Sequence, residues 1–220
     1  MNPPGDVQDF SHASTVVIST GNVQLKGTLT LPVGAKAVVL FAHGSGSSRF
    51  SPRNIFVADV LHAARIGSLL IDLLTPAEDA NYATRFDIAL LTSRLIGATY
   101  WLATASRTAG MRIGYFGAST GAAAALRAAA QFGGEIGAVV SRGGRPDLAG
   151  EDSLRKVLAP TMLIVGGDDA EVIQLNQIAY EYLSCEKQMQ IIPGATHLFE
   201  EPGTLEEAAR LAAEWFKGRL

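Results

Sequence analysis

Residues 110–131, GMRIGYFGASTGAAAALRAAAQ, run from an apolar segment through a glycine-flanked serine into an alanine-rich segment. Met111–Phe116 is short and apolar, as expected of a buried strand, and the alanines that follow favour a helix. The turn between them, residues 117–121, has the pattern G-x-S-x-G with Ser119 at its centre. Such a sharp turn strains the serine backbone, and the flanking glycines remove clashes that larger side chains would cause. The stretch therefore predicts a strand, a turn and a helix, with the Ser119 hydroxyl exposed at the turn.

The pentapeptide alone is a weak signal. In a chain with 23 glycines it can arise by chance, and a serine that only caps the helix would give the same pattern. The interpretation of Ser119 as a nucleophile therefore depends on what the rest of the chain brings to the same place.

The composition is that of a folded globular protein. The 220 residues are 48% hydrophobic and 18% charged, which suits one large α/β domain or two small ones. A net charge of −3 without a basic run argues against a nucleic-acid partner. Residues 1–10 lack the features of a signal peptide, and no apolar run is long enough to span a membrane. The single cysteine, Cys185, fits a reducing compartment, so we expect a cytoplasmic protein.

Eight runs of strand-like sequence are separated, after the first two, by helical patterns. The predicted strands are Thr15–Thr20, Gln24–Leu31, Ala37–Ala42, Ser68–Ile71, Met111–Phe116, Ile136–Val140, Thr161–Val165 and Lys187–Ile192. A turn signal makes the first two an antiparallel hairpin. The later alternation predicts right-handed crossovers and a mostly parallel eight-stranded sheet with helices on both faces. No linker or repeat divides the chain, so we expect a single domain over residues 1–220.

Local signals also predict two helix starts and the openness of the site. Ser51-Pro52 combines an N-cap serine with a first-turn proline. Thr84 and Asp87 have the spacing of a capping box for a helix that runs to about Ser106.

After Ile136–Val140 only about ten residues precede the next helix, so we expect no large lid, a shallow site and modest selectivity.

Four polar segments directly follow predicted strands. They are the turn at Ser119, the aspartates Asp168 and Asp169, His197, and the loop His43–Ser45. The carboxyl ends of parallel strands meet at one edge of a sheet, where open α/β folds place their ligands. The chain order Ser, Asp, His is that of the α/β-hydrolase triad. Ser119 would be the nucleophile, His197 the base that takes its proton, and one aspartate the acid that orients the imidazole.

Five segments resemble the dienelactone-hydrolase-like group of α/β-hydrolases. They are FAHGSGSSRFSPRN (41–54), IGYFGASTGAAAAL (113–126), SRGGRPDLAG (141–150), MLIVGGDDAEVIQLN (162–176) and PGATHLFEEPGTLEE (193–207). More narrowly, the chain is similar to small hydrolases that are sometimes fused to phosphoribosyltransferases. The resemblance implies the α/β-hydrolase fold without a large lid. It has one departure, since the founding dienelactone hydrolases carry cysteine where this chain has Ser119.

The resemblance also bears on the acid and the oxyanion hole. In the family the acid follows a strand, a glycine and two further residues, which matches Asp169; Asp168 stays the alternative and could instead cap the next helix. In this fold one oxyanion donor is the backbone N–H after the nucleophile, here Thr120. The other would be the N–H of Ser45, with Gly44 as the alternative.

Four arginines lie in or beside the loops at this edge. They are Arg49, Arg53, Arg142 and Arg145. One or two of them could bind a substrate carboxylate or phosphate, and we favour Arg142 and then Arg49. The alternative is ion pairing with surface carboxylates. The candidates for that are Asp72, Asp147 and Glu78.

Together these features predict a serine hydrolase that cleaves small carboxylic esters, thioesters or lactones through an acyl-enzyme. Its partner would be a small-molecule ester, and a homo-oligomer is compatible with the sequence. No metal-ligand spacing or phosphate-binding loop is present, so we expect no cofactor and no metal. Two alternatives stay open: a serine peptidase or acyltransferase with the same triad, and a non-catalytic member of the fold that binds a small molecule.

Overall fold

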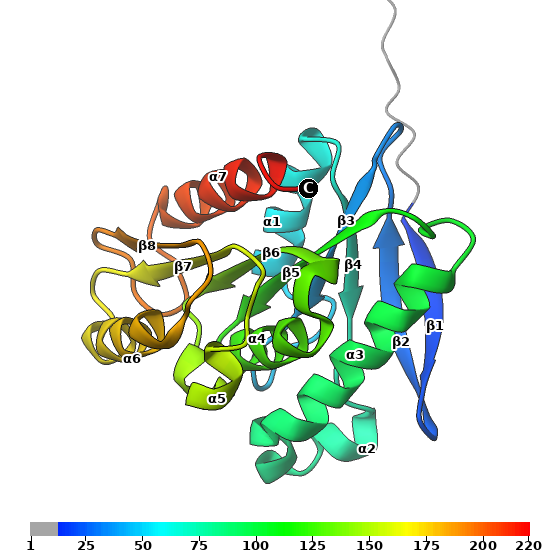
Figure 1. The fold of residues 1–220 in the computed structure, drawn as a ribbon, viewed down its shortest axis with the longest axis horizontal. Coiled ribbons are helices and arrows are strands. Elements are labelled where there is room, and N and C mark those ends of the chain that lie inside the picture. Colours follow the sequence, from blue (N-terminus) through cyan, green and yellow to red (C-terminus); the bar gives the residue numbers. More distant parts are fainter. Residues whose placement is uncertain (1–12) are drawn as a thin grey trace, which may run out of the picture.

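An eight-stranded sheet forms the centre of the computed structural model, which describes residues 13–220 (Figure 1). Its strands are β1 (Ser14–Thr20), β2 (Val23–Thr30), β3 (Ala37–Ala42), β4 (Gly67–Ile71), β5 (Arg112–Ala118), β6 (Ile136–Arg142), β7 (Thr161–Gly166) and β8 (Lys187–Ile192). The expectation that residues 1–10 carry no signal peptide lies outside the described residues.

The strands lie in the order β1-β2-β4-β3-β5-β6-β7-β8. β1 pairs with β2 and β2 with β4 in the antiparallel sense, whereas every other neighbouring pair is parallel. All residues of β3, β4 and β7 are buried, which is why these strands are continuous apolar runs. The predicted hairpin and the mostly parallel sheet are confirmed.

Helices cover both faces of the sheet (Figure 1). One face carries α1 (Pro52–Ala63) and α7 (Thr204–Lys217), and the other carries α3 (Ile88–Thr104), α4 (Thr120–Phe132) and α6 (Ala170–Tyr182). The shorter helices are α2 (Pro76–Asp79), α5 (Glu151–Leu154) and the 3-10 turns η1 (Tyr82–Phe86), η2 (Gly133–Glu135) and η3 (Pro146–Ala149). Between β6 and β7 the chain forms only η3 and α5, which are too short to make the large lid that the sequence also argued against.

Two apolar cores lie between the sheet and its helices, one on each face of the sheet. Tyr115 of β5 lies in the core under α3 and α4, where its hydroxyl hydrogen-bonds to Thr99 at 2.7 Å. Phe116, the next residue, points to the opposite face and packs with Phe41 and Phe216 under α1 and α7. Side chains that alternate in this way fix the register of β5, and with it the position of the turn that follows.

The structure corrects one of the predicted helix starts. Ser51 caps α1 as expected, but α3 begins at Ile88 rather than near Thr84. Asp87 is its N-cap, and the Asp87 carboxylate accepts the N–H of Leu90 at 2.9 Å. Thr84 lies in η1, before the helix. Asp87 caps α3 with its own carboxylate and needs no partner three residues earlier. Within residues 13–220, no helix combines the length and apolarity that crossing a bilayer requires.

Candidate active site

Ser119 lies on a strained turn between β5 and α4. Its φ of 49° and ψ of −124° are in a region that residues other than glycine rarely adopt. Glycine is required on both sides: a Cβ at Gly117 would lie 2.5 Å from Ala122 Cα, and one at Gly121 would lie 2.1 Å from the Ala42 carbonyl oxygen. This elbow of residues 117–121 therefore holds Ser119 at the edge of the sheet while α4 packs directly against β3 and β5.

His197 and Asp169 meet beyond the ends of β8 and β7. His197 Nδ1 lies 2.7 Å from Asp169 Oδ2, and the Asp169 side chain is only 15% exposed. A carboxylate can only accept, so Nδ1 carries the proton and Nε2 is left free as a base. Asp168, the alternative acid, is exposed and contributes its backbone N–H to the Ala195 carbonyl. It does not cap α6, whose N-cap position is occupied by Asp169.

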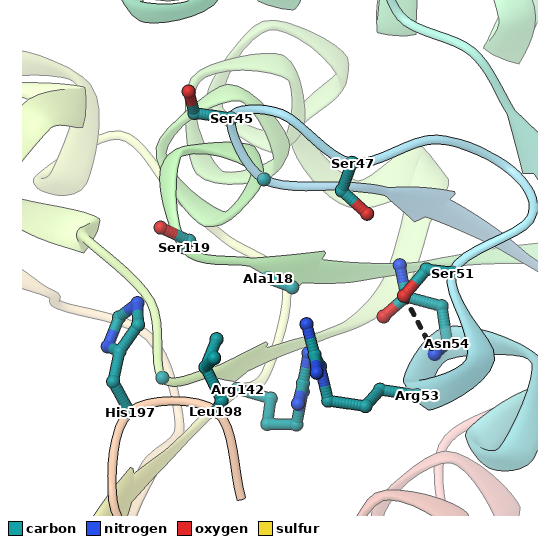
Figure 2. Close-up of a pocket in the computed structure, with 12 residues that line it drawn as sticks. Ser45, Ser47, Ser51, Arg53, Asn54, Ala118, Ser119, Arg142, His197 and Leu198 are labelled. Atoms are coloured by element: carbon teal, nitrogen blue, oxygen red, sulfur yellow. Dashed lines mark hydrogen bonds between the residues drawn. The ribbon is translucent and has the colours of Figure 1, made fainter.

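A pocket of about 180 Å³ opens beside these groups. Both Ser119 and His197 line it, and Figure 2 shows the imidazole extending from its loop toward the serine. The Ser119 hydroxyl has no hydrogen-bond partner among residues 13–220. The two side chains thus share one pocket without a hydrogen bond between them, and a nucleophile and its base often approach fully only when a substrate is bound.

Two backbone N–H groups beside Ser119 are free to bind an oxyanion. In the described part of the chain, neither the Ser45 nor the Thr120 N–H takes part in a backbone hydrogen bond. Thr120 is the first residue of α4, where the helix N-terminus favours negative charge. Gly44 lies so close that a Cβ there would be 2.8 Å from Ser119 Cβ, so only glycine lets the loop approach the serine. The geometry thus brings the predicted donors to the candidate nucleophile.

His43 holds this loop in place. Its Nδ1 lies 2.9 Å from the Gly44 carbonyl oxygen, and its Nε2 accepts the Leu73 N–H at 3.0 Å. The Ser47 N–H also donates to the Gly44 carbonyl. Because a trans peptide points its C=O and N–H in opposite directions, fixing the Gly44 carbonyl also fixes the Ser45 N–H. Burial lowers the pKa of His43 and favours the neutral ring that this pattern needs.

The four arginines at this edge divide into two kinds. Arg49 forms an ion pair with Asp72, and Arg145 forms two hydrogen bonds to Asp147. Neither of these arginines lines the pocket, so the structure does not place Arg49 where the sequence analysis expected it to bind substrate. Its guanidinium is instead neutralised by a carboxylate at the end of β4, which was the alternative interpretation.

Arg142 and Arg53 do line the pocket. Arg142 is the last residue of β6 and is 6% exposed, and its guanidinium lies 5.4 Å from the centre of the Phe199 ring. Burial, together with the charge of Arg53, lowers the pKa of Arg142 to about 10. Arg142 thus stays a cation, one that the fold keeps beside Ser119.

Several residues around the site were missed from the sequence. Asn54, 2% exposed, lines the pocket one residue after Arg53. Glu201 accepts both the N–H and the hydroxyl of Thr196 and so ties down the loop that carries His197. Phe199 is buried with a φ of 56° and lies under Arg142. The Ser51-Pro52 cap could have located Asn54 at the start of a helix facing this edge, but no sequence signal marks the other two.

Cys185 takes no part in the site. It is half-buried between α6 and β8, its Sγ contacts Thr161 Oγ1 at 3.7 Å, and burial raises the pKa of the thiol. In the described residues no group of three or more histidine, cysteine or acidic side chains is placed to bind a metal ion.

Comparisons with known proteins agree with this fold. No protein-family model matches the chain. It is 58% identical to Mycobacterium tuberculosis proteins of strains CDC 1551 and H37Rv, named as phosphoribosyl transferases, over 205 residues, 93% of this chain and 46% of theirs. The chain therefore spans less than half the length of these curated relatives. Among solved structures, the dienelactone hydrolase of Anabaena variabilis is 55% identical, with a TM-score of 0.93 over 96% of this chain and 99% of that chain. Est1E of Butyrivibrio proteoclasticus is 14% identical, with a TM-score of 0.79 over 92% and 97%.

A mostly parallel sheet with a strained serine turn after β5 and a histidine after the last strand defines the α/β-hydrolase fold. Within that fold, the chain belongs to the dienelactone hydrolase family. The predicted fold class and the family resemblance are thereby confirmed.

Proposed function

We propose that this protein is a serine hydrolase that cleaves small carboxylic esters, thioesters or lactones. The observation that carries the proposal is the hydrogen bond of 2.7 Å between His197 and Asp169, beside a pocket that Ser119 also lines. The close relationship to a dienelactone hydrolase supports ester-bond hydrolysis, with serine rather than cysteine as the attacking residue.

The reaction would proceed in two halves. His197 Nε2 removes the Ser119 proton as the oxygen attacks the carbonyl carbon, and Asp169 stabilises the imidazolium that forms. The N–H groups of Ser45 and Thr120 bind the negative charge that develops on the carbonyl oxygen. His197 then protonates the leaving alcohol or thiol, and an acyl-Ser119 intermediate remains. A water activated by the same imidazole releases the acid.

The size of the pocket limits the substrate. A cavity of about 180 Å³ with no lid above it suits a small acyl group and leaves the alcohol half in contact with solvent. We therefore expect broad tolerance for the leaving group. The phosphoribosyl transferase name of the longer relatives belongs to proteins of which this chain matches less than half, and it fixes no substrate here.

A panel of 4-nitrophenyl esters tests the proposal. We expect wild-type protein to hydrolyse short-chain esters and Ser119→Ala to lower kcat/KM by at least about a thousandfold, because triad members act as a unit. Ser93→Ala, which removes an exposed hydroxyl from α3, serves as the matched control and should change nothing. A fluorophosphonate probe should label the wild type and the control but not Ser119→Ala.

Two outcomes would contradict the proposal. If Ser119→Ala were as active and as readily labelled as the wild type, the nucleophile would be another group. If the wild type neither turned over an ester nor reacted with the probe, the chain would be a non-catalytic binding member of its family. Peptide substrates, and an added alcohol or amine acceptor, distinguish a peptidase or an acyltransferase from an esterase.

A further inference from the structure

The lining of the Ser119 pocket carries an unbalanced charge. Two guanidinium groups, those of Arg53 and Arg142, contribute to its surface, whereas no aspartate or glutamate of residues 13–220 does. Figure 2 shows the two groups beside each other, on the side of the pocket away from His197. The two guanidinium groups carry like charges and repel each other, so the fold keeps together two groups that would separate in solution.

Arg142 is the more informative of the two. Its side chain is nine-tenths buried, yet Nε and Nη1 have no hydrogen-bond partner among residues 13–220. The ring of Phe199 gives a cation–π contact, which compensates for only part of the lost hydration. Burial and the charge of Arg53 both lower the pKa of Arg142, and no carboxylate opposes them. A buried cation is costly unless an opposite charge pairs with it, and Arg142 has no such partner among residues 13–220, so its place in the pocket points to an anionic ligand.

Arg53 brings a second charge and the end of a helix. It lies in the first turn of α1, which contains no acidic residue, so the positive end of the helix dipole also faces this region. One Arg53 nitrogen, Nη1, lies 3.2 Å from Glu200, whose side chain is 64% exposed. Such a surface pair is weak and can open when a better anion arrives. The other donors of the guanidinium stay available.

We propose that this pocket selects esters whose acyl half carries a dianionic phosphate or phosphonate group, held between Arg142 and Arg53. The inference deepens the hydrolase function proposed above and rests on it. Two neighbouring cations, of which only Arg53 has a carboxylate partner and that one at the surface, match a double negative charge better than a single one. The leaving group must lie beside His197, which protonates it, so a charge bound on the far side of the pocket belongs to the acyl half.

Three 4-nitrophenyl esters of similar length test the charge preference. Their acyl groups are 3-phosphonopropanoate, succinate and pentanoate, which carry two, one and no negative charges at pH 8. With the Ser119→Ala background subtracted, we expect kcat/KM of the wild type to fall in that order. Arg142→Met should lower kcat/KM about 100-fold for the phosphonate, mainly through KM, because two charge-assisted hydrogen bonds are lost. Its effect on the pentanoate should stay below about threefold.

Two further variants complete the series. Arg53→Gln should cost about tenfold on the phosphonate ester. Because the Arg53 side chain is partly exposed (33%) in the first turn of a helix, this variant keeps the test valid if Arg142→Met does not fold. Arg210→Gln removes one positive charge from the exposed face of α7 and should change nothing. When the phosphonate is moved to the leaving group of an acetate ester, the dependence on Arg142 should disappear.

A binding measurement separates this inference from the hydrolase function. Calorimetry with Ser119→Ala should detect 3-phosphonopropanoate, more tightly than succinate, and the double variant with Arg142→Met should lose that binding. Equal turnover of the three esters, a succinate preference, or equal losses on all three in Arg142→Met would overturn the inference while leaving the hydrolase intact. If no ester is cleaved, the hydrolase function fails, and the calorimetry still decides whether the arginines bind the dianion.

Discussion

Asp168 and Asp169 are adjacent and chemically identical, yet only Asp169 contacts His197. The difference comes from the backbone: the Asp168 N–H is bound by the Ala195 carbonyl, and this leaves its side chain in solvent. Asp169, one residue on, turns inward at the start of α6 and is largely buried. A buried carboxylate with one histidine partner fixes both the tautomer and the orientation of the ring.

The two aspartates can be separated by isosteric substitution. Asp169→Asn should lower kcat by about four orders of magnitude, because an amide can donate to Nδ1 and so stabilise the wrong tautomer. Asp168→Asn should cost tenfold or less, since it changes only an exposed side chain. Steady-state kinetics on a neutral 4-nitrophenyl ester measures both, and circular dichroism verifies that both variants are folded. A larger loss for Asp168→Asn would reverse the assignment.

At the scale of the element, the elbow combines strain with close packing. The positive φ of Ser119 costs roughly 1–3 kcal/mol, which surrounding contacts must offset. The buried alanines of α4 let its backbone approach β5 closely, and Gly121 brings it almost onto the carbonyl ends of β3. The strained conformation of Ser119 is therefore maintained by small side chains on either side of it.

One methyl group should be enough to disrupt this packing. In Gly121→Ala the new Cβ would lie 2.1 Å from the Ala42 carbonyl oxygen and 2.6 Å from that of His43, both rigid backbone atoms. We expect a loss of about 3 kcal/mol or more in the free energy of unfolding, measured by urea denaturation. Gly134→Ala, where nothing lies within 4 Å, is the matched control and should be neutral. Equal stability of the two variants would contradict the packing argument.

The elements could be predicted from the sequence far better than their caps. All eight strands were found: β3, β4 and β7 are buried on both faces and are short, continuous apolar runs, whereas β1 and β2 are partly exposed strand-like runs joined by a turn signal. The start of α3 was misplaced because Thr84 and Asp87 have the right spacing, and only the path of the backbone decides which residue caps. The reciprocal capping box lies in α2, at Thr75 and Glu78.

At the scale of the whole molecule, charge pairing was the least predictable feature. Arg53 pairs with Glu200, 147 positions away, and Arg49 with Asp72, 23 positions away. No local pattern encodes contacts of this kind. That Ser119 and His197 line one pocket, and that Asp169 reaches His197, could be anticipated because the carboxyl ends of parallel strands lie at one edge of a sheet. The absence of an ion-pair partner for Arg142 among residues 13–220 could not be anticipated from the sequence, since it depends on where the fold places every carboxylate.

The stability of the whole protein should depend on pH through His43. Burial lowers the pKa of this side chain below the ordinary 6.5, although Asp72 and Asp79 oppose the shift. Below pH 6.5 the unfolded chain binds a proton that the folded protein resists. The contribution of His43 to stability should therefore be constant above that pH and fall as the pH decreases toward the lowered pKa, by at most about 1.4 kcal/mol per pH unit.

Urea unfolding of the wild type and of His43→Gln between pH 8 and pH 5 measures this effect. The variant should be less stable at pH 8, where the hydrogen bonds to Gly44 and Leu73 are lost or weakened. Its stability should then decline less steeply between pH 6.5 and pH 5 than that of the wild type. Parallel curves would show that another group is responsible for the pH dependence.

The half-buried thiol between α6 and β8 has a practical consequence. Cys185 is the single cysteine of the 220 residues, and burial makes it a poor nucleophile at neutral pH. A second cysteine introduced in place of an exposed residue, for example by Tyr82→Cys, would react first with a maleimide dye. A fluorophore can thus be attached at one chosen point without altering the native sequence elsewhere.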